Sequence, residues 1–147
     1  MNDMDPQALA DAVGRHLSEG EIAADVLGMK MVEIAPGRAV MTMPVTKAML
    51  NAADICHGGL IFTLGDTVLA YAACSHGKRT VSQQASINWL RGAVEGDLLT
   101  ATCTEVSRTR RSGVYDVDIV NRAGERIAVM RCLSRTTDGL AYDPADI

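Results

Sequence analysis

One segment, residues 58–75, constrains the fold of this 147-residue chain more than any other feature of its sequence. Nearly every side chain in it is apolar or small, which predicts a helix that is buried all round rather than amphipathic at a surface. The apolar run from Leu60 to Cys74 is interrupted by Asp66, a glycine and two threonines. It is therefore too short and too polar to span a bilayer, and other elements of the same protein must cover it.

Segments with strand character lie on both sides of this helix. Residues 29–34 and 39–45 are β-prone and flank a turn at 35–38, where Pro36 and Gly37 favour a chain reversal. After the helix, residues 84–89, 99–104 and 115–119 alternate in polarity, which is typical of strands with one wet face. Residues 126–136 are apolar in both phases, which predicts an interior strand.

The two ends of the chain differ in character. Asp5 followed by Pro6 predicts the start of a short amphipathic helix over 5–18, and a second helical turn is expected over 21–27. The acidic residues 138–147 are expected to form a loose tail. The whole pattern predicts one α+β domain over 1–147, with its core at about 27–136. In this hotdog layout, a curled antiparallel sheet of five to six strands wraps round one long central helix.

Composition excludes several classes of function. A net charge of −4 and only five aromatic residues argue against a nucleic-acid partner. The four cysteines show neither a Cys-x-x-Cys pair nor metal-ligand spacing, so no disulfide framework, metal site or cofactor is expected. The first seven residues carry no basic leader, and we expect a cytoplasmic protein with no membrane partner.

A single acid, Asp66, stands in the middle of the predicted central helix. Thr63, Asp66 and Thr67 follow one another at i, i+3 and i+4, which places them on one stripe of the helix. Asp66 could be structural, capping a neighbouring loop or hydrogen-bonding across a subunit interface. Alternatively, it could line a cleft and act as a general base or nucleophile. The residues alone leave both readings open.

The start of the same helix offers a second chemical group. Gly58 and Gly59 precede the apolar run, and free amides at a helix N-terminus favour negative charge. Glycines there let a carbonyl group approach the backbone, and such an amide stabilises an acyl-transfer oxyanion by about 2.7–4 kcal/mol. The alternative is that the glycine pair forms an ordinary flexible turn.

Several motifs together resemble the PaaI-like hotdog thioesterases. The likeness covers about residues 27–134 and rests on the spacing of Asn51, His57-Gly58-Gly59 and Asp66. It extends through the segments 88–91, 96–98 and 113–116. The sequence departs from the family pattern at Gly65 and Gly92, where alanine and proline are usual.

The resemblance implies a role for each matching residue. Asp66 would be the catalytic carboxylate, acting on a thioester bound mainly by the neighbouring subunit. The Gly58 amide would polarise the thioester carbonyl, and Asn51 would orient the attacking water or that carbonyl. His57 would orient its loop or contact the ligand, and Gly59 would leave room for it.

Further residues are second-tier candidates for substrate binding. Ser82 matches a position where relatives carry a hydroxyl near the nucleophilic water, and Thr67 lies beside Asp66. Arg110, Arg111 and Ser112 would lie near the nucleotide end of coenzyme A, whose phosphates need cations. The arginines could equally be solvated surface residues.

These observations predict an acyl-CoA thioesterase that acts on aryl- or arylacetyl-CoA, such as (hydroxy)phenylacetyl-CoA, in phenylacetate degradation. A non-catalytic acyl-CoA-binding module of the same fold would keep the arginines and glycines, but it would have no use for a buried Asp66. An enoyl-CoA hydratase of this fold fits poorly, because His57 lies nine residues before Asp66. The fold needs at least a homodimer, and the resemblance implies a homotetramer.

Overall fold

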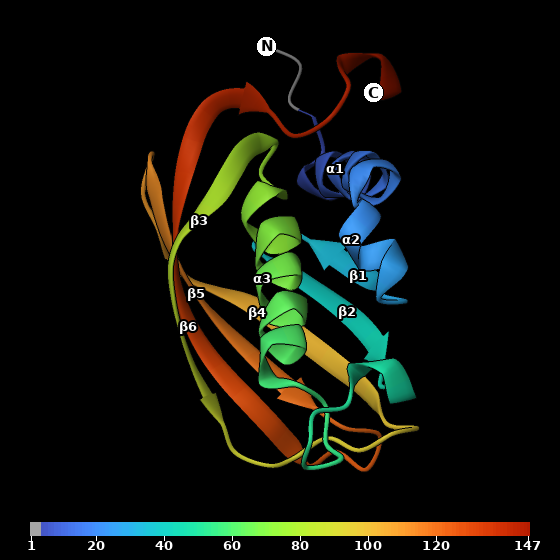
Figure 1. Ribbon diagram of the computed structural model, residues 1–147. Coiled ribbons are helices and arrows are strands. Elements are labelled where there is room, and N and C mark those ends of the chain that lie inside the picture. The colour runs from blue at the N-terminus through green and yellow to red at the C-terminus, as the bar shows by residue number, and fades with distance from the viewer. Residues whose placement is uncertain (1–3) are drawn as a thin grey trace.

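A long central helix, α3 (Gly58–Cys74), lies against the concave face of one curled antiparallel sheet (Figure 1). The computed structural model describes residues 4–147. The sheet has six strands in the order β1-β2-β4-β5-β6-β3, and their bounds are β1 Lys30–Ala35, β2 Arg38–Pro44, β3 Lys78–Trp89, β4 Leu98–Arg108, β5 Ser112–Val120 and β6 Arg126–Leu140. This arrangement confirms the predicted α+β hotdog class.

The first N-terminal helix packs beside α3 on the side that the sheet leaves open, as Figure 1 shows. Helix α1 (Pro6–Gly20) begins as predicted, because the Asp5 carboxylate accepts a hydrogen bond from the amide of Ala8 at 3.0 Å. The Ser18 hydroxyl of α1 lies 3.3 Å from the phenol oxygen of Tyr71 on α3. The short helix α2 (Ile22–Val26) follows, and two single 3-10 turns complete the helical elements of the described chain (Lys47–Met49 and Pro144–Asp146).

The sheet supplies the inner wall of the core. Strand β5 alternates strictly between buried and half-buried residues, and its buried side chains face α3 together with those of β4 and β6. Helix and sheet approach each other closely at Gly65, since a Cβ atom there would collide with the sulfur of Met130. The departure at Gly65 therefore permits close helix–sheet packing. Strand β6 is an interior strand, as predicted.

Strand β3 contains a β-bulge that the sequence did not indicate. Ser82 pairs with Ser134 and Gln84 pairs with Leu133, so Gln83 is an extra residue opposite the β6 ladder. The bulge reverses the phase of alternation. As a result Ser82, before the bulge, and Trp89, after it, both belong to the inner face of the sheet. The strand begins at Lys78, six residues before the predicted segment 84–89. The prediction missed these residues because the bulge interrupts the alternation of polar and apolar side chains.

Two expectations from the sequence are wrong. The residues after 137 are not all loose, because β6 continues to Leu140, which pairs with Lys78, and Ala141 is 3% exposed. Helix α3 is not covered all round, because sheet and α1 leave one stripe accessible in the single chain. Gly59, Thr63, Asp66 and Ala70 form that stripe. None of the helices within residues 4–147 is both long enough and apolar enough to cross a membrane.

Candidate active site

Asp66 lies on the accessible stripe of α3, half-buried, and is held by a residue of β3. The Ser82 hydroxyl donates a hydrogen bond to the Asp66 carboxylate. A hydroxyl donor fixes the orientation of a carboxylate. The structure therefore brings these two predicted residues together and leaves one carboxylate oxygen without a recorded protein donor among residues 4–147.

The thiol of Cys132 lies on β6 under the same helix. Burial first, and then the charges of Asp66 and Asp116, raise the pKa of this thiol to about 11. A thiol with so high a pKa stays protonated at neutral pH and is a poor nucleophile. Among the groups around Asp66, the carboxylate itself is therefore the one suited to activate water.

The N-terminus of α3 presents a free amide. Gly58 is the first helical residue, and the structure records no acceptor for its N–H within the described chain. The carbonyl of the same peptide, His57 C=O, accepts from the amides of Leu60 and Ile61 at 3.0 and 3.4 Å. Donors on the carbonyl polarise the peptide and strengthen the N–H as a donor. The Gly58 amide is thus well suited to stabilise an oxyanion.

His57 is the N-cap of α3, and its side chain acts on the backbone. Its Nδ1 atom accepts a hydrogen bond from the Gly59 amide at 3.1 Å. An accepting Nδ1 carries no proton, so the neutral ring bears its proton on Nε2. This geometry agrees with the predicted role in orienting the loop and gives Gly59 a part in the cap. The same contact makes His57 unsuited to be the catalytic base.

Asn51 organises the loop before α3. Its side-chain Oδ1 atom accepts hydrogen bonds from the backbone amides of Ala53 and Ile55 at 2.9 and 3.4 Å. The backbone amide of Asn51 donates to the Ile55 carbonyl. The side-chain nitrogen has no recorded partner among residues 4–147. It therefore remains available as a donor toward a bound carbonyl or water.

Thr67 was predicted to share the accessible stripe with Asp66, but it does not lie on that stripe. Its side chain is 9% exposed, and its hydroxyl donates to the Thr63 carbonyl at 2.7 Å. This bond within the helix satisfies the hydroxyl as a donor. The sequence spacing placed Thr67 close to Asp66 correctly, but burial removes it from the accessible surface.

The two proposed catalytic groups of one chain are far apart. Gly58 and Asp66 are eight residues apart on a continuous helix, which corresponds to about 12 Å along the axis at the usual helical rise. An aspartate side chain leans toward the N-terminus of its helix, but it is too short to bridge such a distance. A single thioester cannot contact both groups of the same subunit.

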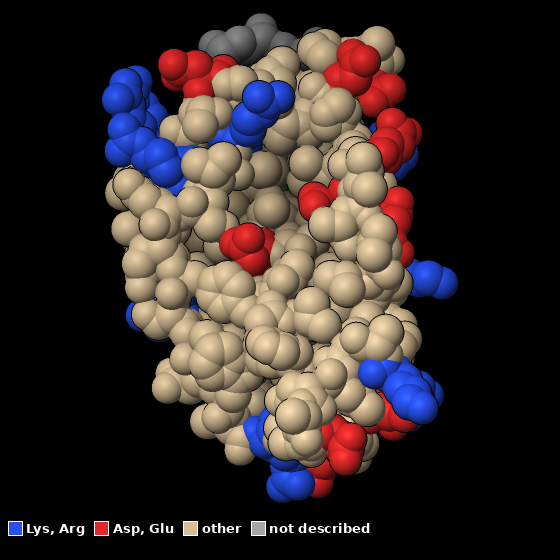
Figure 2. Space-filling model, viewed as in Figure 1, with Lys and Arg blue, Asp and Glu red and all other residues tan. Residues whose placement is uncertain are grey.

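A strongly basic pocket of ≈ 630 Å³ lies at the turn between β4 and β5. Its lining contains five cationic side chains and one acid, together with two threonines: Lys78, Arg108, Arg110, Arg111, Arg135, Asp138, Thr136 and Thr137. Figure 2 shows basic side chains gathered toward the upper left of the face that holds α3, and acidic side chains at the edge of a hollow in the middle of that face. Arg110 and Arg111 therefore belong to a cluster, whereas Ser112 begins β5 and is half-buried.

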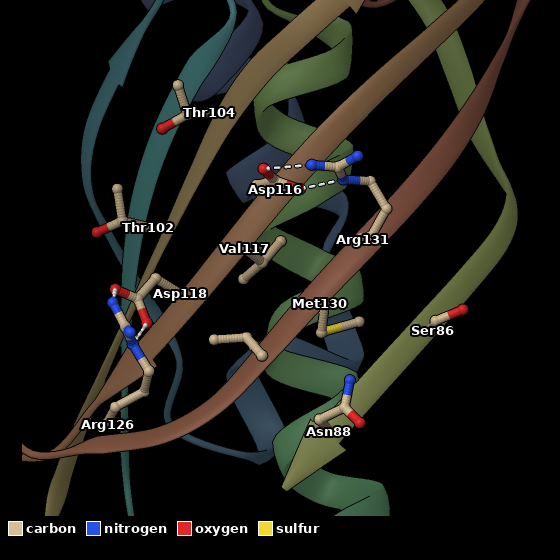
Figure 3. Close-up of a pocket in the computed structure, with 11 residues that line it drawn as sticks. Ser86, Asn88, Thr102, Thr104, Asp116, Val117, Asp118, Arg126, Met130 and Arg131 are labelled. Atoms are coloured by element: carbon tan, nitrogen blue, oxygen red, sulfur yellow. Dashed lines mark hydrogen bonds and ion pairs between the residues drawn. The ribbon is translucent and has the colours of Figure 1, made fainter. Parts of the chain in front are cut away.

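A second hollow, of ≈ 720 Å³, lies on the opposite face of the sheet (Figure 3). Its charged groups are paired with one another: Arg131 binds Asp116 and Arg126 binds Asp118, each through two hydrogen bonds. The Arg131 hydrogen bond holds the pKa of Asp116 below its usual range. Because these charges satisfy each other, this hollow is unsuited to an anionic substrate and is separate from Asp66.

One residue at the site escaped the sequence analysis. Trp89, the only tryptophan of the chain, donates a hydrogen bond from Nε1 to the Gly58 carbonyl at 3.1 Å. The sequence analysis included this residue at the end of an alternating strand and within the family-like segment 88–91, but gave it no role. Local alternation puts its side chain on the inner face with Ala85 and Ile87, but its place beside Gly58 comes from a contact between residues 31 positions apart.

Comparisons with known proteins agree with this geometry. The family model described as "Thioesterase superfamily" matches residues 53–128, just over half of the chain. The acyl-coenzyme A thioesterase PaaI of Escherichia coli is 40% identical over 121 residues, covering 82% of this chain and 86% of the relative. Human acyl-coenzyme A thioesterase 13 is 31% identical over 107 residues, covering 70% and 76%.

Solved structures show the same likeness. The E. coli PaaI protein of the phenylacetic acid degradation operon superimposes with a TM-score of 0.91 at 36% identity, covering 92% of this chain and 99% of that one. A hypothetical thioesterase of Streptococcus pneumoniae, solved with coenzyme A, has a TM-score of 0.78 at 28% identity and covers 82% and 96%. The predicted resemblance is confirmed, and the chain belongs to the thioesterase superfamily, among its PaaI-like hotdog members.

Proposed function

We propose that this chain hydrolyses acyl-CoA thioesters to the free acid and coenzyme A, with arylacetyl-CoA esters as its substrates. The observation that carries the proposal is an oriented carboxylate, Asp66, on the accessible stripe of a central helix whose N-terminus presents a free amide. The names of the E. coli and human relatives support the reaction, and the phenylacetic acid operon of the E. coli structure supports the aryl group.

Each active site combines two subunits. Because Gly58 and Asp66 of one chain are about 12 Å apart along α3, the amide of one subunit must act with the carboxylate of another. A two-fold axis beside α3 would bring each Gly58 next to the partner's Asp66 and create two identical sites. The accessible stripe of small and polar residues on α3 suits such an approach.

The unpaired edge of β3 supports this assembly. This 12-residue strand pairs only with β6 in the described chain, and Val81 on it is 49% exposed. A long unpaired edge with exposed apolar residues favours pairing with a second copy of the same strand. We infer a homodimer as the minimal active unit, and we extend the proposal to a homotetramer in the cytoplasm, as expected from the sequence.

The chemistry follows from the positions of the groups. The thioester carbonyl oxygen accepts from the Gly58 amide and from the Asn51 side-chain nitrogen, which polarises the carbonyl carbon. Asp66, oriented by Ser82, takes a proton from water, and the resulting hydroxide attacks that carbon. The tetrahedral oxyanion collapses, the carbon–sulfur bond breaks, and the thiolate leaves and takes up the proton. Direct attack by the Asp66 carboxylate, followed by hydrolysis of the anhydride, uses the same groups.

The basic pocket completes the substrate site. Its arginines and Lys78 suit the phosphates of coenzyme A, since guanidinium groups bind phosphate oxygens with two parallel hydrogen bonds. Lys78 and Ser82 are four residues apart on β3, which corresponds to about 13 Å along the strand. An extended pantetheine arm spans this kind of distance between phosphates and thioester. A purely binding role is not favoured, because it would leave the Asp66–Ser82 arrangement without use.

The test is thiol release from phenylacetyl-CoA by the parent protein and by Asp66→Asn. The amide keeps the size of the side chain and an oxygen for Ser82 but is not a base, so kcat should fall at least about 100-fold. Asp116→Asn is the matched control, because it makes the same change on the outer face of the sheet and should keep kcat within about twofold. Equal turnover by Asp66→Asn and the parent protein would contradict the proposal.

A further inference from the structure

We propose that Trp89 is a positioning residue that holds the Gly58–Gly59 peptide in place and thereby aims the Gly58 amide at the substrate carbonyl. This inference rests on the proposed function of Gly58 as the oxyanion donor. It concerns a contact between the end of β3 and the start of α3, which are 31 residues apart in the sequence.

The peptide between Gly58 and Gly59 is fixed at both of its polar ends. Trp89 Nε1 donates to the Gly58 carbonyl at 3.1 Å, and the Gly59 amide donates to His57 Nδ1 at 3.1 Å. The indole also covers Gly58 itself, since a Cβ atom there would lie 3.0 Å from Trp89 Cε2 and Nε1. The Trp89 ring thus fills the space beside the backbone that a side chain at position 58 would occupy.

Such support is needed because two consecutive glycines form the first turn of α3. Glycine has the largest conformational freedom of any residue, and ordering it costs the most backbone entropy. An oxyanion donor stabilises the transition state fully only when it is already oriented before the reaction. A Gly58 that moved freely would spend part of its time with the amide aimed elsewhere, and kcat would fall.

The backbone of Trp89 is itself well anchored. Trp89 pairs with Ala128 of β6, and the next two amides, of Leu90 and Arg91, donate to the Ile127 carbonyl at 2.8 and 3.3 Å. Because of the bulge at Gln83, the inner face of β3 carries both Ser82, which orients Asp66, and Trp89, which orients Gly58. One strand therefore positions both reacting groups of its subunit.

The test compares Trp89→Phe with Trp89→Ala. Phenylalanine keeps a ring against Gly58 but lacks the N–H, so kcat for phenylacetyl-CoA should fall about 2- to 10-fold, the effect of one net hydrogen bond, with KM within twofold. Alanine removes bond and ring and should lower kcat further. Leu90→Ala is the control, because it removes exposed apolar surface at the next residue and leaves the indole bond intact. Size-exclusion chromatography checks that all variants keep the parental assembly.

A second measurement follows the peptide directly. Heteronuclear NOE values of the Gly58 and Gly59 amides should fall in both Trp89 variants and stay parental in Leu90→Ala. A parental kcat in Trp89→Phe overturns the inference, and so does a lowered kcat with both glycine amides still rigid, because Trp89 would then act on the substrate. If the parent protein releases no thiol from any ester, the proposed function fails, and the amide measurement alone decides whether Trp89 holds the peptide.

Discussion

Two inactive variants of this protein should restore activity to each other when they assemble together. Asp66→Ala removes the carboxylate. Gly58→Pro removes the amide hydrogen and suits the helix start, because proline is favoured at the first helical position, but its Cβ atom meets Trp89 as that of alanine would. His57, with φ −58° and ψ 129°, already has the conformation that a residue before proline adopts. Gly58→Ala is the matched control, since it adds a Cβ atom against Trp89 but keeps the N–H.

The expected magnitudes follow from the separation of the two groups. Loss of one oxyanion donor lowers kcat about 10²- to 10³-fold, and loss of the base has a comparable effect, so each homomeric variant should retain at most about 1% of parental activity. In a heterodimer of the two, one site combines the intact Gly58 of one subunit with the intact Asp66 of the other. That dimer should show about half of the parental kcat, because one of its two equivalent sites is complete.

The assay is thiol release by heterodimers purified through two different affinity tags after co-expression. Recovery to tens of per cent of parental activity would agree with a site shared between subunits. A heterodimer no more active than either homodimer would refute the reasoning, because every site would then contain one defect from its own chain. Gly58→Ala paired with Asp66→Ala separates the loss of the N–H from the steric effect on Trp89.

Three further predictions concern stability and binding. Gly65→Ala should lower the free energy of unfolding by about 1–3 kcal/mol, since its Cβ atom would collide with Met130, and an unchanged urea midpoint would contradict this. Arg111→Ala should raise KM for phenylacetyl-CoA about 3- to 10-fold and leave KM for the N-acetylcysteamine thioester, which lacks the nucleotide, unchanged. The pKa of Cys132, raised from 9.0 to about 11, means that only the unfolded thiol ionises between these values. The free energy of unfolding, measured with urea, should therefore fall as the pH rises from 9.0 to about 11. This fall should be smaller in Cys132→Ala.

Much of the fold could be predicted because local rules and tertiary packing agree. Asp5 caps α1 as its position suggested, Gly37 turns the first hairpin at φ +72°, and the doubly apolar segment at 126–136 lies inside the sheet. The central helix was evident because an apolar segment of this length needs cover on most sides. The residues themselves indicated Asp66 and Gly58, and the family spacing added Asn51; the catalytic roles of all three remain predictions.

The errors arise where contacts distant in sequence override a local pattern. The first half of β3 was missed because Gln83 interrupts the alternation, and only the pairing with β6 defines it as one strand. The same pairing orders residues 138–140, whose acidic composition had suggested a tail. Thr67 was expected near the ligand because helical spacing gives a stripe but not the direction from which sheet and α1 cover it.

The composite site cannot be inferred from the motifs alone, although they contain its geometry. A motif suggests that its residues meet, yet eight residues of helix keep Gly58 and Asp66 about 12 Å apart in every copy of the chain. In the proposed assembly, two antiparallel copies of α3 related by a two-fold axis near Phe62 would exchange these positions, so the same separation that excludes a site within one subunit would create two sites between subunits. Any change that separates the β3 edges should therefore abolish both sites at once, with every catalytic side chain still present. On this proposal, the chemistry of the chain depends on the pairing of two subunits.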